Sequence, residues 1–361
     1  MSMMEYKCPN CGGTIEFDSQ SQQMVCPFCG STFDVEALKQ YDEELSQASA
    51  KEESTNWNPQ TEEWREGEQE GMRVYTCNSC GGEIIGDETM AATSCPFCGN
   101  NTVIMGQFMG MLKPNLIIPF KMDKEAAKKA LKEHYKGKIL LPKVFKDENH
   151  LDEIKGIYVP FWLFDGDADA KIMFDATRIR TWSDSNYRYT ETSHYSVLRD
   201  GELSFNDIPV DGSDKMSDEM MESIEPYKME DAVDFQTAYL AGYLADKYDV
   251  DSEQAIGRAN DRIRKSTEHT FAETVTGFVT VTTNSSNISI EKGDVSYALL
   301  PVWMLTTKWN DNKYLFAMNG QTGKLIGDLP MDKTKFGLWF AGLTVGVGVV
   351  ASLIMWFAGL L

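Results

Sequence analysis

The stretches YKCPNCGGTIEFDSQSQQMVCPFCGSTF (residues 6–33) and YTCNSCGGEIIGDETMAATSCPFCGNNTV (residues 75–103) decide the fold of the N-terminal part of this chain. They are two copies of one segment, offset by 69 positions. The offset aligns Tyr6 with Tyr75, and it aligns the tetrapeptide PFCG that begins at Pro27 with the one that begins at Pro96. Because the copies align without a gap, we interpret them as an internal duplication.

Each copy carries two CxxC pairs with 14 residues between them. Two residues between cysteines allow one tight turn to present both sulfurs to a single cation at about 2.3 Å. The 14 residues suit a short β-hairpin, with Ile15 and Phe17 on the outgoing strand and Met24 on the returning strand. Two such turns close a site of four thiolates, which leaves no position open for catalysis. We therefore predict two structural Zn²⁺ ions, one per ribbon, with the ligands Cys8, Cys11, Cys26 and Cys29 in the first and Cys77, Cys80, Cys95 and Cys98 in the second.

Other uses of these cysteines fit the sequence less well. A rubredoxin-type iron centre shares the CPxCG turn, but its two turns normally lie further apart. A thioredoxin-like redox pair needs a βαβ context, which is absent here. All eight cysteines occur in CxxC pairs, and in a reducing compartment this pattern indicates metal binding rather than disulfides.

The C-terminal stretch FGLWFAGLTVGVGVVASLIMWFAGLL (residues 336–361) contains no charged residue. A membrane span needs about 20 such residues in a helix. Trp339 and Trp356 would lie about 25 Å apart along that helix, which suits one aromatic belt at each interface. The alternative is a buried core helix, but Thr344 and Ser352 are the only polar positions. We predict that Phe336–Leu361 is a transmembrane helix.

The flanks of this stretch predict its orientation. Lys333 and Lys335 precede it, so the positive-inside rule places the bulk of the chain in the cytoplasm. The N-terminus MSMMEYKCPN has no signal-peptide pattern, which agrees. We expect a single-pass, tail-anchored protein of the cell membrane. Gly342 and Gly346 form a GxxxG pattern that would suit a homo-oligomer of tails, although lipid-facing glycine explains it equally well.

Composition limits the range of functions. A hydrophobic share of 42% is enough for a folded core, and 361 residues suit two to three domains. The net charge of −21 and the pI of about 4.6 are a poor match to a nucleic-acid backbone. The second ribbon has no Lys or Arg between Tyr75 and Gly106, so we do not expect nucleic acid as a partner.

The fold class that we predict is α+β multidomain, with a mostly antiparallel sheet in the middle domain. We divide the chain into ribbon 1 (1–34), an acidic and partly helical linker (35–72), ribbon 2 (73–105), an α+β domain (113–330) and the transmembrane helix (336–361). The linker helix would carry Leu38, Tyr41 and Leu45 on one side. Trp57 and Trp64 are unusual in a hydrophilic linker; we expect them to pack on a neighbouring ribbon, the alternative being a partner-docking motif.

Within residues 113–330 we expect both helices and strands. Residues 122–137 read as a helix that Asp123 caps and Gly137 stops. Further helices are expected over 231–248 and 252–266, and strands over 157–179, 187–198 and 274–290. A β-meander over 297–328 would turn at residues 310–312 and 319–320. Two pairs of similar segments, which begin at Pro119 and Pro226 and at Pro160 and Pro301, raise the hypothesis of two related halves.

Two motifs only partly match known sites. Residues 165–169 place aspartates like a calcium loop, but Ala170 and Ala176 stand where glycine and glutamate belong. Residues 320–325 end like a P-loop, but Met318 replaces its first glycine and Leu325 its Ser or Thr. We expect a strand edge and a hairpin turn there. No catalytic constellation is recognisable, and we predict that the protein is not an enzyme.

The four CxxC pairs, together with the tail, carry a resemblance to a known group. Each ribbon resembles the zinc ribbons of transcription factor IIB and rubredoxin-like turns. The whole arrangement looks like bacterial membrane-anchored tandem zinc-ribbon proteins, which are encoded beside phage-shock-protein-A-like and flotillin/stomatin-type proteins. This resemblance implies that the chain holds such partners at the membrane, in a response to envelope stress.

From these observations we predict a zinc-ribbon adaptor, or scaffold, that binds partner proteins and localises them at the membrane. The alternative is a membrane-tethered zinc-ribbon protein that binds nucleic acid. The cysteine-rich ribbons are compatible with both interpretations, because ribbons are used for either purpose.

Overall fold

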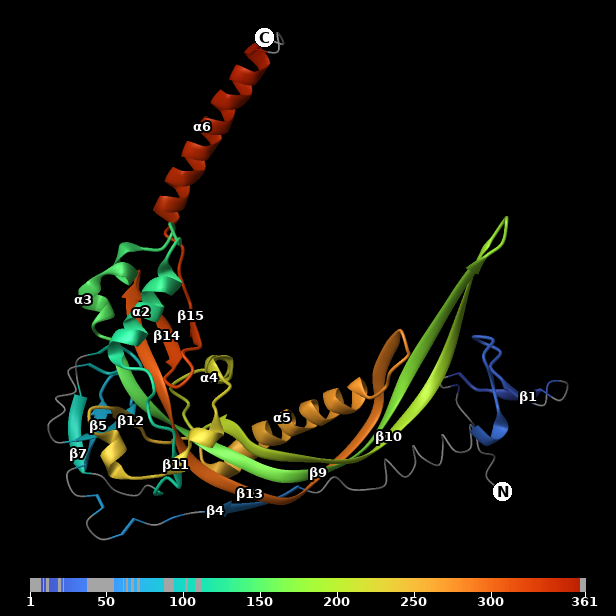
Figure 1. The fold of residues 1–361 in the computed structure, drawn as a ribbon, viewed down its shortest axis with the longest axis horizontal. Coiled ribbons are helices and arrows are strands. Elements are labelled where there is room, and N and C mark those ends of the chain that lie inside the picture. The colour runs from blue at the N-terminus through green and yellow to red at the C-terminus, as the bar shows by residue number, and fades with distance from the viewer. Residues whose placement is uncertain are drawn as a thin grey trace. The chain divides into compact units, whose positions relative to one another are not determined.

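The computed structural model has the predicted fold class: mixed α and β, with two cysteine clusters and one apolar C-terminal helix (Figure 1). It describes residues 8, 10, 13–18, 21, 23–37, 55–60, 62, 64–65, 68–69, 72–87, 94–100, 103–107 and 112–357. The linker helix expected around Leu38, Tyr41 and Leu45 lies outside the described residues, as do Cys11 and the last four residues of the chain.

The chain forms two compact units, each built from segments that are far apart in sequence. The first unit comprises residues 1–59, 164–208 and 256–295, and the second comprises 60–163, 209–255 and 296–361. Three long strands and one long helix contribute residues to both units. They are β9 (Lys155–Ser183), β10 (Arg188–Asp211), β13 (Thr280–Trp309) and α5 (Ser252–Glu273).

The first unit contains the first ribbon and a helix-covered sheet. The ribbon strands β1 (Glu16–Asp18), β2 (Gln23–Val25) and β3 (Thr32–Phe33) pair antiparallel in the order β1-β2-β3, so the predicted hairpin is confirmed. Strand β4 (Thr55–Gln60) pairs with β13. The alternating side chains of β9, from Ala168 to Phe174, are buried against Ile263 of α5 and Ile288 of β13.

The second unit is built on a mixed sheet. β8 (Leu116–Ile117) runs parallel to β13 and antiparallel to β11 (Val233–Asp234). β14 (Asn312–Asn319) pairs antiparallel with β13 and with β15 (Leu325–Gly327). The β13–β14 turn is the predicted one, and its residues Asn310 and Asp311 have φ angles of 51° and 61°.

The second ribbon is part of this sheet. Its strands β5 (Met72–Cys77), β6 (Glu83–Asp87) and β7 (Val103–Gln107) pair in the order β6-β5-β7. β12 (Leu244–Asp246) joins them to the rest of the unit, because it pairs antiparallel with β6 and parallel with β9. Backbone hydrogen bonds therefore run continuously from the ribbon into the body of the unit.

Short helices cover both faces of the sheet in the second unit, because one of them shares a core with Val302 and Met304 of β13 and the others share a core with Trp303 and Leu305. They are α2 (Lys124–Tyr135), the 3-10 turn η1 (Lys143–Lys146), α3 (Glu148–Leu151) and α4 (Asp218–Ile224). As predicted, the Asp123 carboxylate caps α2 by accepting a hydrogen bond from the Ala126 N–H at 2.8 Å. Gly137 follows the helix with a φ of 76°, where a side chain would be strained.

The helix predicted over residues 231–248 is wrong. The structure divides this segment into η2 (Met229–Asp231), β11, η3 (Thr237–Leu240) and β12. Gly242 has a φ of 82°, which a continuous helix does not allow. Strand pairing to β6, β8 and β9 is worth more here than local helix propensity, because the three residues of β12 are buried by that pairing.

Helix α6 (Lys333–Phe357) closes the second unit in sequence, and its 25 residues are long and apolar enough to cross a membrane. None of its described side chains is buried against the protein. An apolar helix with no protein surface to cover it is not the core helix that the sequence left as an alternative. Among the described residues it is the one helix long and apolar enough for a membrane span, which is compatible with a single-pass membrane protein.

Candidate metal centres

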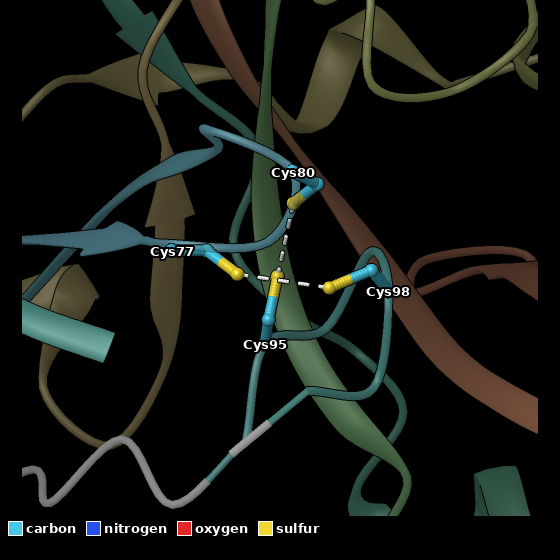
Figure 2. Close-up of side chains that lie close together, drawn as sticks. All are labelled: Cys77, Cys80, Cys95 and Cys98. Atoms are coloured by element: carbon cyan, nitrogen blue, oxygen red, sulfur yellow. Dashed lines mark hydrogen bonds between the residues drawn. The ribbon is translucent and has the colours of Figure 1, made fainter. Parts of the chain in front are cut away.

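The four cysteines of the second ribbon come together in one cluster. All four sulfurs lie within 4.8 Å of one another (Figure 2). The Sγ atoms of Cys77 and Cys98 are 3.6 Å apart, and those of Cys80 and Cys95 are 3.7 Å apart. A tetrahedral zinc with Zn–S bonds of about 2.3 Å separates its ligands by about 3.8 Å. These distances fit such a cation, and they are far longer than a disulfide bond of about 2.05 Å.

The backbone explains why each CxxC turn has this shape. The Cys77 N–H donates to the Gly82 carbonyl at 2.9 Å, and the Gly81 N–H donates back to the Cys77 carbonyl at 2.8 Å. Gly81 has a φ of 71°. The second turn repeats this pattern, with the Cys95 N–H donating to the Asn100 carbonyl at 2.7 Å. In the second ribbon, the glycine after each CxxC pair thus supplies the left-handed residue that closes the turn.

The described hydrogen bonds of the first ribbon follow the same pattern. The Cys8 N–H donates to Gly13 at 2.7 Å, and the Cys26 N–H donates to Ser31 at 2.9 Å. The sulfurs of Cys8, Cys26 and Cys29 lie within 4.8 Å of one another, and those of Cys8 and Cys29 are 3.6 Å apart. The remaining predicted ligand, Cys11, lies outside the described residues. The three described ligands are thus already gathered for one cation.

The electrostatics of the thiols suit a cation. Burial raises the pKa of Cys80 and of Cys95, so these thiols hold their protons in the absence of a positive charge. Burial opposes ionisation of Cys77 too, but hydrogen bonds from the Cys80 and Ser79 backbone bring its pKa down to about 7. In the first ribbon, hydrogen bonds from Ser31 lower the pKa of Cys29 to about 6. A divalent cation would ionise the remaining thiols, because thiols that bind a metal are deprotonated.

The two ribbons differ in how their matching phenylalanines are buried. Both rings pack on the second glycine of their ribbon: a Cβ on Gly13 would lie 2.6 Å from the Phe28 ring, and one on Gly82 would lie 2.9 Å from the Phe97 ring. Phe97 is nevertheless only 8% exposed, whereas Phe28 is 75% exposed. The difference therefore comes from the outer face of each ring.

The body of the second unit covers Phe97. The cluster that contains Phe97, Cys95 and Cys98 also contains Leu163 of β9 and Met304 of β13. Polar contacts fix the ribbon to the same body. The Thr306 hydroxyl donates to the Pro96 carbonyl at 2.6 Å, and the Lys247 ammonium donates to the Glu83 carboxylate at 2.7 Å. The first ribbon has a small core of its own, made by Cys8, Ile15 and Cys26 with Met24 and Phe33.

A cavity of about 750 Å³ lies beside the second ribbon, and no sequence motif pointed to it. Its lining combines ammonium groups of Lys124, Lys155 and Lys308 with the imidazole of His150. His150 is held from both sides, since its Nε2 lies 2.7 Å from the Thr307 hydroxyl and its Nδ1 lies 3.0 Å from Glu153. Lys155 donates to the Ser94 hydroxyl at 2.7 Å, which ties the cavity wall to the ribbon.

The two incomplete motifs lie in ordinary secondary structure, as expected. Asp165 and Asp167 belong to β9; Asp165 accepts from the Asp207 N–H and Asp167 accepts from the Ser204 hydroxyl of β10. Residues 320–324 form the β14–β15 turn, in which the Asn319 N–H donates to the Lys324 carbonyl at 2.8 Å. Across the described part of the chain, the two cysteine groups are the sets of three or more side chains that could hold a metal ion.

The linker tryptophans have different surroundings. Trp57 packs edge-on against Phe164 at 4.9 Å and donates its indole N–H to Asn260 at 3.0 Å, so its predicted packing on a ribbon is wrong. Trp64 lies edge-on to Phe235 at 5.8 Å and lines a small cavity together with Met72 and Leu299. For Trp64 the packing on a neighbouring ribbon stays a prediction, although Ile85 of the second ribbon lines the same cavity.

Comparisons with known proteins agree with this architecture. Residues 6–43 match the family described as TFIIB zinc-binding, so the first ribbon is a zinc ribbon of that type. The uncharacterized protein YdjG of Bacillus subtilis (strain 168) is 33% identical over 352 residues, which are 98% of this chain and 97% of YdjG. The chain belongs to the same family as YdjG. Since that alignment spans both units, the family is defined by the whole arrangement and not by one ribbon. No solved structure matches the chain.

Proposed function

We propose that the protein is a non-enzymatic, membrane-anchored adaptor, whose first ribbon binds a partner protein that α6 then holds at the cell membrane. The observation that carries the proposal is the contrast between Phe28 and Phe97. The same aromatic side chain, on the same turn, is covered by protein in one copy and exposed in the other. Large exposed aromatic side chains are typical of protein interaction sites.

The exposed surface of the first ribbon defines the chemistry of the partner. Phe28 and Phe17, the latter 53% exposed, are the large apolar side chains of this surface. The acidic residues Glu16 and Asp34 are exposed on the same ribbon, and the exposed Glu36 follows it directly. A complementary partner therefore offers an apolar pocket for Phe28 with a basic rim. The acidic residues of the ribbon disfavour nucleic acid as the occupant, because its phosphates would meet like charge.

We propose that each ribbon holds one structural Zn²⁺. The support is the set of sulfur distances in the second ribbon, the matching turns of the first, and the zinc-ribbon match of residues 6–43. The ion would stabilise two ribbons that are too small to fold on apolar burial alone. It would do no chemistry itself, because four thiolates leave no coordination position open.

The orientation and the partners are part of the same proposal. Lys333 and Lys335 at the start of α6 support a cytoplasmic location for both units. The resemblance to tandem zinc-ribbon membrane proteins suggests flotillin/stomatin-type or phage-shock-protein-A-like partners in envelope stress. A second copy of the chain is a further proposed partner, through packing of Gly342 and Gly346 between two tails.

The test is affinity purification of the full-length chain from detergent-solubilised membranes after cross-linking in cells, for the wild type and for Phe28→Ala. We expect Phe28→Ala to lose the main co-purifying proteins while it keeps its zinc content. Tyr187→Ala is the matched control, because Tyr187 is also a strongly exposed aromatic residue (68%) but lies outside the ribbon. The same set of proteins with Phe28→Ala as with the wild type would overturn the proposal.

A further inference from the structure

A lysine-rich segment interrupts an otherwise acidic chain. Residues 128–146 contain seven lysines and one acidic residue, Glu133, in a chain of net charge −21. The lysines are Lys128, Lys129, Lys132, Lys136, Lys138, Lys143 and Lys146. The segment comprises most of α2, the turn that follows and η1. We call its exposed side the lysine surface.

Part of this charge is neutralised by neighbouring carboxylates and part is not. Lys128 pairs with Asp152, Lys132 pairs with Glu148, and Lys136 lies 3.3 Å from Glu133. The other four lysines form no ion pair with a carboxylate of the described residues; they are Lys129, Lys138, Lys143 and Lys146. Lys138 instead lies 2.9 Å from the His134 imidazole, and Lys146 donates to the Lys138 carbonyl at 3.0 Å. The lysine surface therefore keeps an excess of positive charge.

The lysine surface lies next to the start of α6, within the second unit. The Asp332 N–H donates to the Leu140 carbonyl at 2.9 Å, and the Lys335 ammonium donates to the Leu141 carbonyl at 2.5 Å. Figure 1 shows α2 and α3 gathered near the base of α6. Since the uncharged stretch begins at Phe336, these contacts hold residues 140–141 beside the first turn of the apolar helix.

The surface also has a groove and an apolar side chain. An open groove of about 230 Å³ is lined by three lysines, two carboxylates and two apolar side chains, which are Lys132, Lys136, Lys146, Glu133, Glu148, Tyr135 and Leu151. Lys132 and Lys136 are paired with the two glutamates, and the ammonium group of Lys146 leaves the groove with an excess of positive charge that suits a phosphate headgroup. Ile139, 55% exposed, lies between Lys138 and the segment that contacts α6. Basic side chains around one exposed apolar residue are typical of surfaces that lie on membranes.

We propose that the lysine surface docks on anionic phospholipid headgroups of the leaflet from which α6 emerges. The attraction falls off within about 10 Å in physiological salt, so it requires the close approach that the contacts to Leu140 and Leu141 enforce. Other acidic parts of the chain are repelled by the same leaflet, and the lysine surface would thus select which side of the second unit faces the membrane. This inference rests on the membrane anchoring by α6 in the proposed function.

The test uses the purified full-length chain inserted in lipid nanodiscs, one set of phosphatidylcholine alone and one set that also contains phosphatidylglycerol. An amine-reactive label reports the accessibility of each lysine by mass spectrometry. We expect labelling of Lys129, Lys143 and Lys146 to slow by about fivefold in the anionic nanodiscs, the factor that corresponds to the attraction of one lysine to an anionic surface. High salt should restore the labelling rate. The exposed lysines Lys265, Lys308 and Lys313 are internal controls that should not change.

Three further arms make the result decisive. Inorganic phosphate added to phosphatidylcholine nanodiscs should not slow labelling, and if it does so as strongly as the anionic lipid, the site binds free phosphate and the lipid proposal is wrong. In anionic nanodiscs we expect residues 136–146 to be protected from hydrogen exchange. A variant should lose this protection when four lysines of the surface are changed to Gln, namely Lys129, Lys136, Lys143 and Lys146. The control variant should keep it; its four changes to Gln are at Lys228, Lys265, Lys308 and Lys313. If the lysines are labelled equally fast in both kinds of nanodisc, the docking proposal is wrong but the membrane anchor stands. If the chain inserts in neither kind of nanodisc, the proposed anchoring by α6 is wrong.

Discussion

The contrast between the two ribbons predicts two very different costs for the same substitution. Phe97→Ala removes a side chain that is 8% exposed, and Phe28→Ala removes one that is 75% exposed. A buried Phe→Ala change costs about 3–5 kcal/mol, which combines lost transfer energy with the cavity left behind. Only a quarter of the Phe28 side chain is covered, so its loss should cost below about 1 kcal/mol.

The second unit reports on this difference directly, because Phe97 packs with Leu163 and Met304 in its core. Urea titration of the detergent-solubilised, zinc-loaded chain can be followed by the fluorescence of Trp162 and Trp303, both buried in the second unit. We expect Phe97→Ala to lower the urea midpoint by about 1 M or more. Phe28→Ala should leave the midpoint of this transition unchanged.

The result that would refute the reasoning is an equal shift for both variants. An equal shift would mean that Phe28 is covered in the folded protein, and the surface proposed for partner binding would not exist. A negligible shift for Phe97→Ala would show instead that the second ribbon is not part of the core of its unit.

The remaining predictions concern zinc, pH and a helix cap. Cys77→Ser and Cys8→Ser should each lose one zinc ion by mass spectrometry, but only Cys77→Ser should lower the urea midpoint of the second unit, since Cys77 belongs to its core. Burial raises the pKa of Asp246 to about 8, so the folded state holds a proton that the unfolded state releases near pH 4. The stability of the second unit should therefore fall as the pH rises from about 4 to 8, and Asp246→Asn should remove this decrease in urea titrations. Asp123→Ala, which deletes the cap of α2, should cost about 1 kcal/mol in the same assay, whereas Asp123→Asn should be nearly neutral.

The local features of this protein were predictable from the sequence. The turns of the ribbons follow from cysteine spacing and glycine, because a CxxC turn needs a left-handed residue directly after it. The cap at Asp123 and the turn at Asn310 and Asp311 depend on hydrogen bonds and φ angles within a few residues. The apolar helix α6 follows from composition alone. In each case the feature depends on residues that are close together in the sequence.

The tertiary structure decided what the ribbons and the intermediate segments do. Two copies with nearly the same motif differ because β12 pairs with β6 and the body covers Phe97, and both β12 and Met304 come from more than a hundred residues away in sequence. The segment 231–248 has helical periodicity but forms strands, since pairing with distant strands outweighs local propensity. The packing of Trp57 and the position of the lysine surface likewise depend on contacts with distant residues. The partner is Asn260 in the first case and the base of α6 in the second. Sequence patterns report local geometry, but burial and exposure depend on which distant segments meet.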